Sequence, residues 1–202
     1  MTISIGRHAG QIPATFKSDV RGDTCNDEAL IERIAKGDQL AMRALFVRHR
    51  VKVYRFVLRL VRNPASAEDV LSEVFLEVWR HASRFTFHAT VSTWLLAIAR
   101  RKAMSELRRR KYLELDADLA DNLPDQSDDP EAAVQRKASA QVLQRALADL
   151  SPAHAEVLDL VYYHGKSVKE VAGITGVPEA TVKTRMFYAR KRLMDVARAI
   201  AA

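Results

Sequence analysis

The sequence predicts an all-α protein with two small helical domains, and three observations support this. Glycine and proline are scarce, with 7 and 6 among 202 residues, and Ala, Leu, Arg and Glu, which lose little rotamer freedom in a helix, are abundant. Apolar residues recur three and four positions apart over most of the chain, as on one face of a helix. Residues 113–134 are acidic and contain no Lys or Arg, which separates two apolar-rich parts of the sequence.

The beginning of the chain predicts an arm followed by two helices. Residues 1–25 mix small, polar and charged residues without a period, and we expect a flexible arm there. The apolar residues of the first helix fit one face, and Gly37 is placed to end it. Asp38 is placed to cap the next helix, over residues 39–61, which the pair Asn63 and Pro64 ends.

Two further helices complete the expected N-terminal domain, which we place at residues 26–112. The third helix is expected from about Ala67 to Trp79. The fourth is expected from about Ser92 to Lys111. The apolar positions spaced for their buried faces are Val70, Leu71, Val74, Phe75, Val78, Trp94, Leu95, Ile98 and Leu107.

Residues 113–134 are expected to be a flexible linker, because like charge and little apolar material cannot build a core. The C-terminal domain follows at residues 135–202. A helix is expected over 135–150, and Ser151 with Pro152 is placed to open another, which Gly165 ends. Ser167 and Glu170 fit a capping box for a short helix over about 167–175. A turn at 176–178 then leads to the last helix, over about 179–199.

Charge and cysteine content restrict the function classes. The formal charge of +7 indicates a polyanionic partner, either nucleic acid or an anionic membrane surface. No apolar run approaches the roughly 20 residues of a membrane span, and no signal-peptide core is evident, so we expect no membrane insertion. The single cysteine, Cys25, cannot form an intrachain disulfide or a cysteine-rich zinc site, and we expect it to be a free thiol in the cytoplasm.

The C-terminal pair of helices fits a helix-turn-helix unit, in which the second helix enters the major groove of DNA. Val182 and Met186 lie four apart and suit the core. The other side of this helix carries polar and aromatic residues, with three arginines available for phosphates: Lys183, Thr184, Phe187, Tyr188, Arg185, Arg190 and Arg192. The alternative interpretation is a basic amphipathic helix that closes a bundle. The coincidence of cap, turn and basic face favours DNA binding.

Motifs for catalysis are not evident, so we expect that the protein is not an enzyme. We therefore expect no catalytic residue, no cofactor and no small-molecule substrate. The chain has no Gly-rich phosphate loop, no G-x-S-x-G and no H-E-x-x-H. Its histidines lack the spacing of metal ligands, and we expect no metal site. They are His8, His49, His81, His88, His154 and His164.

The motifs in both halves resemble a known family, the extracytoplasmic-function (ECF) sigma factors. The C-terminal half resembles their region 4 in the run 146–152, in 167–172, and in Thr181 to Arg185 with Ala189 and Arg190. This half also resembles, less closely, the helix-turn-helix of LuxR-type regulators. The N-terminal half resembles sigma region 2 in Gly37 and Asp38, in the helix 67–75, and in residues 93–100.

The resemblance implies three functional surfaces. An acidic stripe on the third helix, Asp69, Glu73 and Glu77, is implied to bind RNA polymerase, although such a stripe taken alone is usually a solvated face. Contacts to the −10 promoter element are implied for the loop 85–92 and the basic helix after it: Phe87, His88, Arg100, Arg101, Arg108 and Arg109. Contacts to the −35 element are implied for the last helix: Thr181, Lys183, Thr184, Arg185, Phe187, Tyr188 and Arg190.

Some residues in these surfaces have other interpretations. Phe85 and Trp94 are aromatic but suit core packing, which leaves Phe87 and His88 as the better candidates for DNA. Arg101 stands where the family usually has Asn, and Ser105 where it usually has an acidic residue. These departures concern the preferred −10 sequence and not the general role.

The resemblance implies a sigma factor that binds core RNA polymerase and directs promoter-specific initiation. It would read the −35 element as duplex and melt the −10 element, in a stress response controlled by a cognate anti-sigma factor. The alternative is a LuxR-type helix-turn-helix regulator that never joins the polymerase. The acidic stripe and the aromatic loop argue against this alternative.

Overall fold

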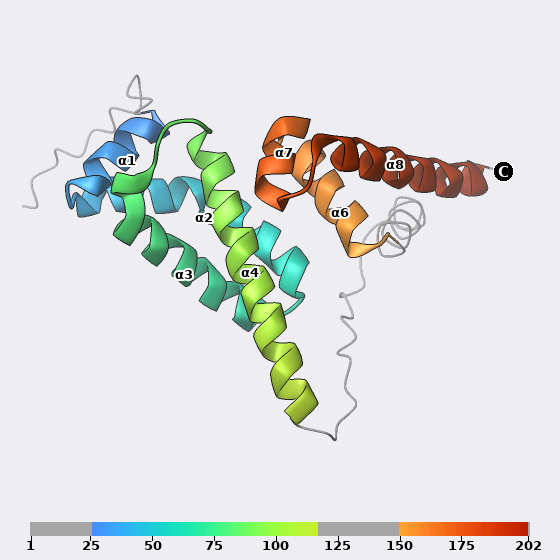
Figure 1. The fold of residues 1–202 in the computed structure, drawn as a ribbon, viewed down its shortest axis with the longest axis horizontal. Helices are drawn as coiled ribbons and strands as arrows, with labels where there is room; N and C mark the ends of the chain where they lie inside the picture. Colours follow the sequence, from blue (N-terminus) through green and yellow to red (C-terminus); the bar gives the residue numbers. More distant parts are fainter. Residues whose placement is uncertain (1–25, 117–149, 202) are drawn as a thin grey trace, which may run out of the picture.

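The computed structural model describes residues 26–116 and 150–201, and the regular structure of these residues is helical (Figure 1). This confirms the predicted fold class. The expected N-terminal arm, the helix expected over 135–150 and most of the expected linker lie outside the described residues.

The N-terminal domain, residues 26–116, consists of four α-helices and one short 3₁₀ turn. They are α1 (Asp27–Ala35), α2 (Gln39–Val61), α3 (Pro64–His81), η1 (Ala82–Arg84) and α4 (Val91–Asp116). Gly37 has a φ of +86°, and the Asp38 side chain accepts hydrogen bonds from the backbone N–H groups of Leu40 and Ala41 at 2.9 and 3.1 Å. Both features confirm the predicted break between the first two helices.

Two helix boundaries differ from the prediction. Helix α3 begins at Pro64, not at Ala67, because the Asn63 side chain accepts a hydrogen bond from the Ser66 N–H at 2.9 Å and proline fits the first helical position. Helix α4 continues to Asp116, so the first four residues of the predicted linker are helical. No Gly or Pro interrupts these residues, and a helix propagates readily through leucine and glutamate.

The C-terminal domain, residues 150–201, contains α6 (Pro152–Leu158), η2 (Asp159–Tyr163), α7 (Val168–Thr175) and α8 (Glu179–Ala201). The element η2 is a turn of π-helix, closed by a hydrogen bond from the His164 N–H to the Asp159 carbonyl at 3.1 Å. The sequence did not predict this change of helix type. Gly165 follows with a φ of +64° and ends the segment, as predicted.

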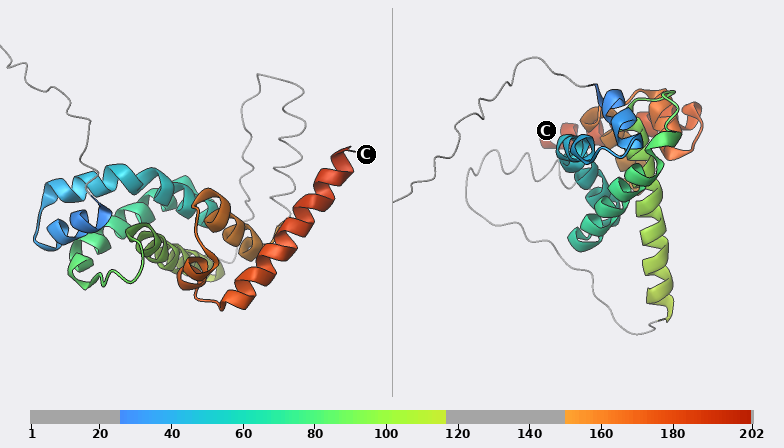
Figure 2. Two further views of the ribbon diagram at one scale, coloured as in Figure 1. Left: turned by 90° about the horizontal axis from the view of Figure 1, so that it is seen from above. Right: turned by 90° about the vertical axis from the view of Figure 1, so that its left-hand side faces the viewer.

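The two domains pack against each other, which the sequence did not predict. Helix α7 lies beside the N-terminal half of α4, and the views of Figures 1 and 2 agree on this placement. Buried residues from both domains form one continuous apolar cluster, which includes Leu95 of α4 and Val157, Leu160 and Val171 of the C-terminal domain. The C-terminal parts of α4 and α8 project away from this packed body (Figure 2).

The cap of α3 gives a prediction about stability. Asn63→Ala removes the acceptor for the Ser66 N–H, and loss of such a cap costs about 1 kcal/mol of unfolding free energy. Urea unfolding followed by circular dichroism measures the loss. Asn63→Asp keeps an acceptor at the same position and should stay close to the parent. Equal unfolding midpoints for parent and Asn63→Ala would contradict the role of the cap.

Candidate nucleic-acid interface

Helices α7 and α8 form the predicted helix-turn-helix unit. The capping box at the start of α7 is confirmed: the Ser167 hydroxyl accepts from the Glu170 N–H at 3.3 Å, and the Glu170 carboxylate accepts from the Ser167 N–H at 3.0 Å. Gly176 ends α7 with a φ of +70°. Val182 and Met186 of α8 are buried in the core, as predicted. Burial of these two residues fixes which face of α8 points outward.

The outward face of α8 carries the predicted base-reading residues. Lys183, Thr184, Phe187 and Tyr188 are exposed, and the two aromatic residues are 63% and 55% exposed. Their rings pack edge to face with centroids 5.5 Å apart. Adjacent large exposed rings are unusual on a surface that faces only water, so this face fits a partner. The other predicted residues on this helix are half-buried Thr181 and Arg185 and exposed Arg190.

Tyr162 of the π turn contacts Arg190 of α8, and sequence reasoning missed this contact. Its hydroxyl accepts a hydrogen bond from Arg190 Nε at 2.7 Å, and the Arg190 guanidinium lies 5.6 Å from the centre of the Tyr162 ring. The pair holds the guanidinium on the exposed side of α8. Because the two residues come from different helices, the periodicity of α8 alone contains no signal for this contact.

The loop between η1 and α4 holds the predicted aromatic residues for the −10 element. Phe87 is 47% exposed and has a φ of +56°, an uncommon conformation for a bulky residue. Its ring packs on the ring of Phe85, with the ring centroids 4.8 Å apart, and the ring of Phe85 packs on that of Trp94, with the centroids 5.0 Å apart. Phe85 is buried and Trp94 is half-buried, so core packing explains them, whereas Phe87 and His88 remain exposed.

A shallow hollow of about 310 Å³ adjoins this loop. It is lined mainly by apolar groups of α1 and η1 and by Phe87, which forms part of its wall. The strained backbone of Phe87 therefore places a ring at the mouth of an apolar hollow, a surface on which another flat ring can pack.

Most of the predicted −10 cations of α4 are ion-paired with carboxylates of the same chain. Arg100 donates from Nε to Glu156 of the other domain at 2.6 Å. Arg101 is ion-paired with Glu77, and Arg109 with Glu106 at 2.9 Å. Arg108 donates to the Met104 carbonyl at 3.3 Å. The sequence suggested a basic face directed at DNA, and the structure shows that three of these four arginines are ion-paired with carboxylates, which belong to α6, α3 and α4 itself.

The acidic stripe of α3 contributes to this pairing. Glu77 contacts both Arg101 and Lys102, and only 20% of its side chain is exposed. Glu73 lies 3.2 Å from Lys102 Nζ but is 58% exposed, and Asp69 is exposed. Asp69 and Glu73 are thus accessible to a partner, while Glu77 is largely covered.

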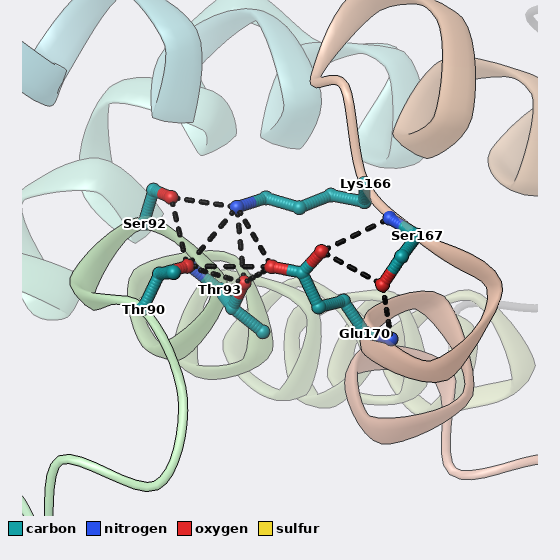
Figure 3. Close-up of polar contacts among 6 residues, drawn as sticks. All are labelled: Thr90, Ser92, Thr93, Lys166, Ser167 and Glu170. Atoms are coloured by element: carbon teal, nitrogen blue, oxygen red, sulfur yellow. Dashed lines mark hydrogen bonds and ion pairs between the residues drawn. The ribbon is translucent and has the colours of Figure 1, made fainter.

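A polar cluster between the domains was also missed by sequence reasoning (Figure 3). Lys166 is only 8% exposed, and its Nζ donates to the Ser92 and Thr93 hydroxyls at 2.6 and 2.9 Å. Glu170 accepts from the Thr93 hydroxyl at 2.5 Å. Burial raises the pKa of Glu170, but hydrogen bonds from Thr93 and Ser167 and the nearby Lys166 charge outweigh this and lower it to about 2. Glu170 is therefore a carboxylate at neutral pH.

Comparison with known proteins agrees with this geometry. The family Sigma-70 region 2 matches residues 45–112, and the family Sigma-70, region 4 matches residues 140–193. The ECF RNA polymerase sigma factor SigL of Mycobacterium tuberculosis is 32% identical over 170 residues, which cover 82% of this chain and 93% of that protein. The RNA polymerase sigma factor CarQ of Myxococcus xanthus is 31% identical over 169 residues, which cover 82% of this chain and 94% of CarQ.

Solved structures that share the fold include the following two complexes. The sigma factor RpoE in complex with the anti-sigma factor NepR from Bartonella quintana aligns with a TM-score of 0.62 and 22% identity, over 77% of this chain and 96% of RpoE. CnrH in complex with the cytosolic domain of CnrY aligns with a TM-score of 0.59 and 24% identity, over 86% of this chain and 97% of CnrH. With both family matches in the predicted order and relatives above 30% identity along most of the chain, the protein belongs to the ECF family of RNA polymerase sigma factors.

Proposed function

We propose that this sigma factor reads the −35 element through α8, opens the −10 element at the loop before α4, and contacts the polymerase through α3. Its family membership makes it a transcription initiation factor that binds core RNA polymerase and promoter DNA. The observation that supports the assignment of surfaces best is the outward face of α8, where lysine, threonine and two aromatic residues stand exposed opposite a buried apolar face.

The −35 assignment follows from the position of these residues along α8. Lys183, Thr184 and Phe187 lie in the first turns of the helix, the part that reaches base edges when such a helix enters the major groove. Arg190 lies about two turns after Lys183 and is held outward by Tyr162, which suits a contact to the phosphate backbone.

The −10 assignment rests on the loop around Phe87. Melting requires a surface for an unstacked base, and stacking on an aromatic side chain tolerates any base. Phe87 is exposed, held in a strained backbone conformation and packed on the Phe85 and Trp94 pair. The hollow beside it offers apolar surface for a base that leaves the duplex.

The polymerase assignment rests on the exposed part of the acidic stripe. Asp69 and Glu73 are accessible on α3, whereas Glu77 of the same helix is largely covered and is ion-paired with Arg101 and Lys102 of α4. Complementary charge at such a surface favours association more than it favours folding. The LuxR-type alternative is not favoured, because the sigma region 2 match covers the half of the chain that contains this stripe.

A cognate anti-sigma factor is part of the proposal. The two solved structures described above are complexes, RpoE with the anti-sigma factor NepR and CnrH with the cytosolic domain of CnrY. The proposed setting is a stress response in the cytoplasm, without a catalytic role. In the part of the chain that the structure describes, no helix is long and apolar enough to cross a membrane, and no three potential metal ligands gather.

A first prediction concerns the polymerase. Asp69→Lys combined with Glu73→Lys should weaken binding to core RNA polymerase by roughly a factor of 10 or more, because like charges would then oppose each other at the interface. The affinity of the double variant for core RNA polymerase is measured by competition against labelled parent protein. Glu32→Lys with Asp195→Lys makes the same total charge change at exposed positions elsewhere and should bind normally. Equal affinity of the two double variants would contradict the assignment.

A second prediction concerns opening of the −10 element. Phe87→Ala with His88→Ala should leave binding to duplex promoter intact but reduce opening, because stacking of a freed base is worth about 1–3 kcal/mol. Permanganate reactivity of −10 thymines reports the open state. A template with mismatched, already open −10 bases should restore initiation by the double variant. Parent-like reactivity on duplex DNA would exclude this loop from melting.

A third prediction separates base reading from phosphate anchoring on α8. Lys183→Ala should change which −35 variants are preferred, by about 1–3 kcal/mol at the position it reads. Arg190→Ala should weaken all variants alike and lower the salt slope by about one unit. Tyr162→Phe, which loses only the hydroxyl that holds Arg190, should produce a smaller uniform loss.

Binding of the full chain to a panel of −35 duplexes with single-base changes, at several salt concentrations, measures these effects. If Lys183→Ala and Arg190→Ala produced the same uniform loss, the orientation of α8 in the groove would be wrong.

A further inference from the structure

Helix α2 exposes an apolar strip on the side opposite its buried face. In this strip, Leu40, Val47 and Val51 are 73%, 62% and 49% exposed, and Ala44 is exposed between them. The core side of the helix consists of other residues, such as the fully buried Leu45. Helix α2 lies along the edge of the packed body, in cyan in the left-hand view of Figure 2. The strip is therefore open to a partner on the part of the molecule that the structure describes.

The four residues of the α2 strip have the spacing of a coiled-coil seam. They are four, three and four positions apart, which is the alternation of the a and d positions of a heptad. This spacing aligns them along one side of the helix over about 17 Å, at about 1.5 Å per residue. Single exposed apolar residues are common on protein surfaces, whereas a continuous apolar strip marks a site for another apolar surface.

Arginines border the α2 strip on both sides. In the heptad that places the strip at a and d, the g positions hold Arg43 and Arg50, and two e positions hold Arg48 and Arg55. The remaining e position, Ala41, is buried. Residues at e and g lie beside the seam of a coiled coil and form ion pairs with the partner helix, so they decide which partner binds. Four cations at these positions select a partner with carboxylates.

The arginines on the two sides of the strip differ in their contacts. On the e side, Arg48 is ion-paired with Asp27 of α1, and Arg55 donates a hydrogen bond to the Tyr163 hydroxyl at 2.7 Å. On the g side, both arginines are exposed, and no carboxylate of the described residues forms an ion pair with either of them. The g side thus carries the positive charge that is open to a partner.

An acidic helix fits this surface better than a second copy of the chain or nucleic acid does. Two copies of α2 packed along their strips would set arginine against arginine, and such repulsion excludes a pair in coiled coils. Nucleic acid would neutralise the arginines, but its phosphate backbone has no apolar group to cover the residues between them. An amphipathic helix with carboxylates beside its apolar face complements both parts of the surface.

We infer that α2 docks an acidic amphipathic helix of a partner protein. Apolar residues of that helix pack on the α2 strip, and its carboxylates lie against Arg43 and Arg50. None of the residues in this site belongs to the surfaces proposed above for DNA or for the polymerase. The site therefore fits a partner that leaves those surfaces accessible.

Two synthetic peptides test this site on the full chain. Both are fluorescently labelled and span about three heptads, with isoleucine at a and leucine at d. One carries glutamate at every e and g position, and the other carries lysine there. Fluorescence anisotropy should show that the parent binds the acidic peptide at least about tenfold more tightly than the basic one, because only the acidic peptide complements the arginines. Added salt should weaken this preference.

Two double variants at exposed positions separate the charges from the apolar strip. Arg43→Glu with Arg50→Glu should reverse the preference, so that the basic peptide binds more tightly than the acidic one. Leu40→Gln with Val47→Gln should weaken the acidic peptide by at least about tenfold without a change of charge, because the apolar contact is lost. Circular dichroism of each variant shows whether the helical content of the parent is kept.

The matched control is Arg80→Glu with Arg84→Glu, which makes the same charge change at exposed positions of α3 and η1. This control should keep the preference of the parent for the acidic peptide. Equal affinity of the parent for the two peptides would overturn the inference. The same preference in the control and in the Arg43 and Arg50 double variant would also overturn it.

Two further measurements examine the other occupants. Analytical ultracentrifugation of the parent should show no dimer that the Leu40 and Val47 double variant lacks, and such a dimer would assign the strip to a second copy of the chain. Binding to duplex DNA of random sequence should be equally affected by the Arg43 and Arg50 double variant and by the control. A larger loss of DNA binding in the Arg43 and Arg50 double variant, with unchanged affinity for the acidic peptide, would assign the arginines to nucleic acid and overturn the inference.

Discussion

The burial of one face of α4 is the interaction on which the rest of the structure depends. Leu95 and Ala99 are fully buried, and the helix packs on α2 and α3 along one side and on α7 along another. The loop with Phe87 ends where α4 begins, so the position of this loop follows from the burial of the helix. The cations of α4 reach α3 and α6 for the same reason. A cavity in this core would thus disturb both parts of the proposed −10 surface, the loop and the cations of α4.

Local features of the fold were predictable from sequence, because short-range chemistry specifies them. The capping box of Ser167 and Glu170, the left-handed Gly37 and the cap at Asp38 each depend on residues within a few positions of one another. The buried and exposed faces of α8 followed from helical period. The exposure of Phe87 and the burial of Phe85 also agreed with prediction.

The remaining features depend on how distant segments pack, and no local pattern encodes them. Arg100 and Glu156 are 56 positions apart, and their contact exists only because the domains dock. The π turn that sends Tyr162 to Arg190 and Tyr163 to Arg55 is likewise a product of tertiary packing. Charged residues on a helix were interpreted as facing DNA or solvent, although several of them neutralise one another across helices.

Ion pairs within the chain affect how strongly this protein of net charge +7 attracts DNA. The hydrogen bond from Arg109 lowers the pKa of the Glu106 carboxyl, which therefore stays ionised and competes with phosphate for that arginine. A cation that exchanges a carboxylate for a phosphate contributes less net attraction than one that is paired with no carboxylate. The salt dependence of −10 binding should therefore be shallower than the number of basic residues on α4 suggests.

Reconstituted transcription tests most directly whether this chain supplies promoter recognition to RNA polymerase. Core polymerase alone and with the purified chain is incubated with a library of genomic fragments, and the 5′ ends of the transcripts are sequenced. The chain should produce defined start sites that share two sequence elements upstream, at −35 and −10. Start sites identical to those of core polymerase alone would contradict this function.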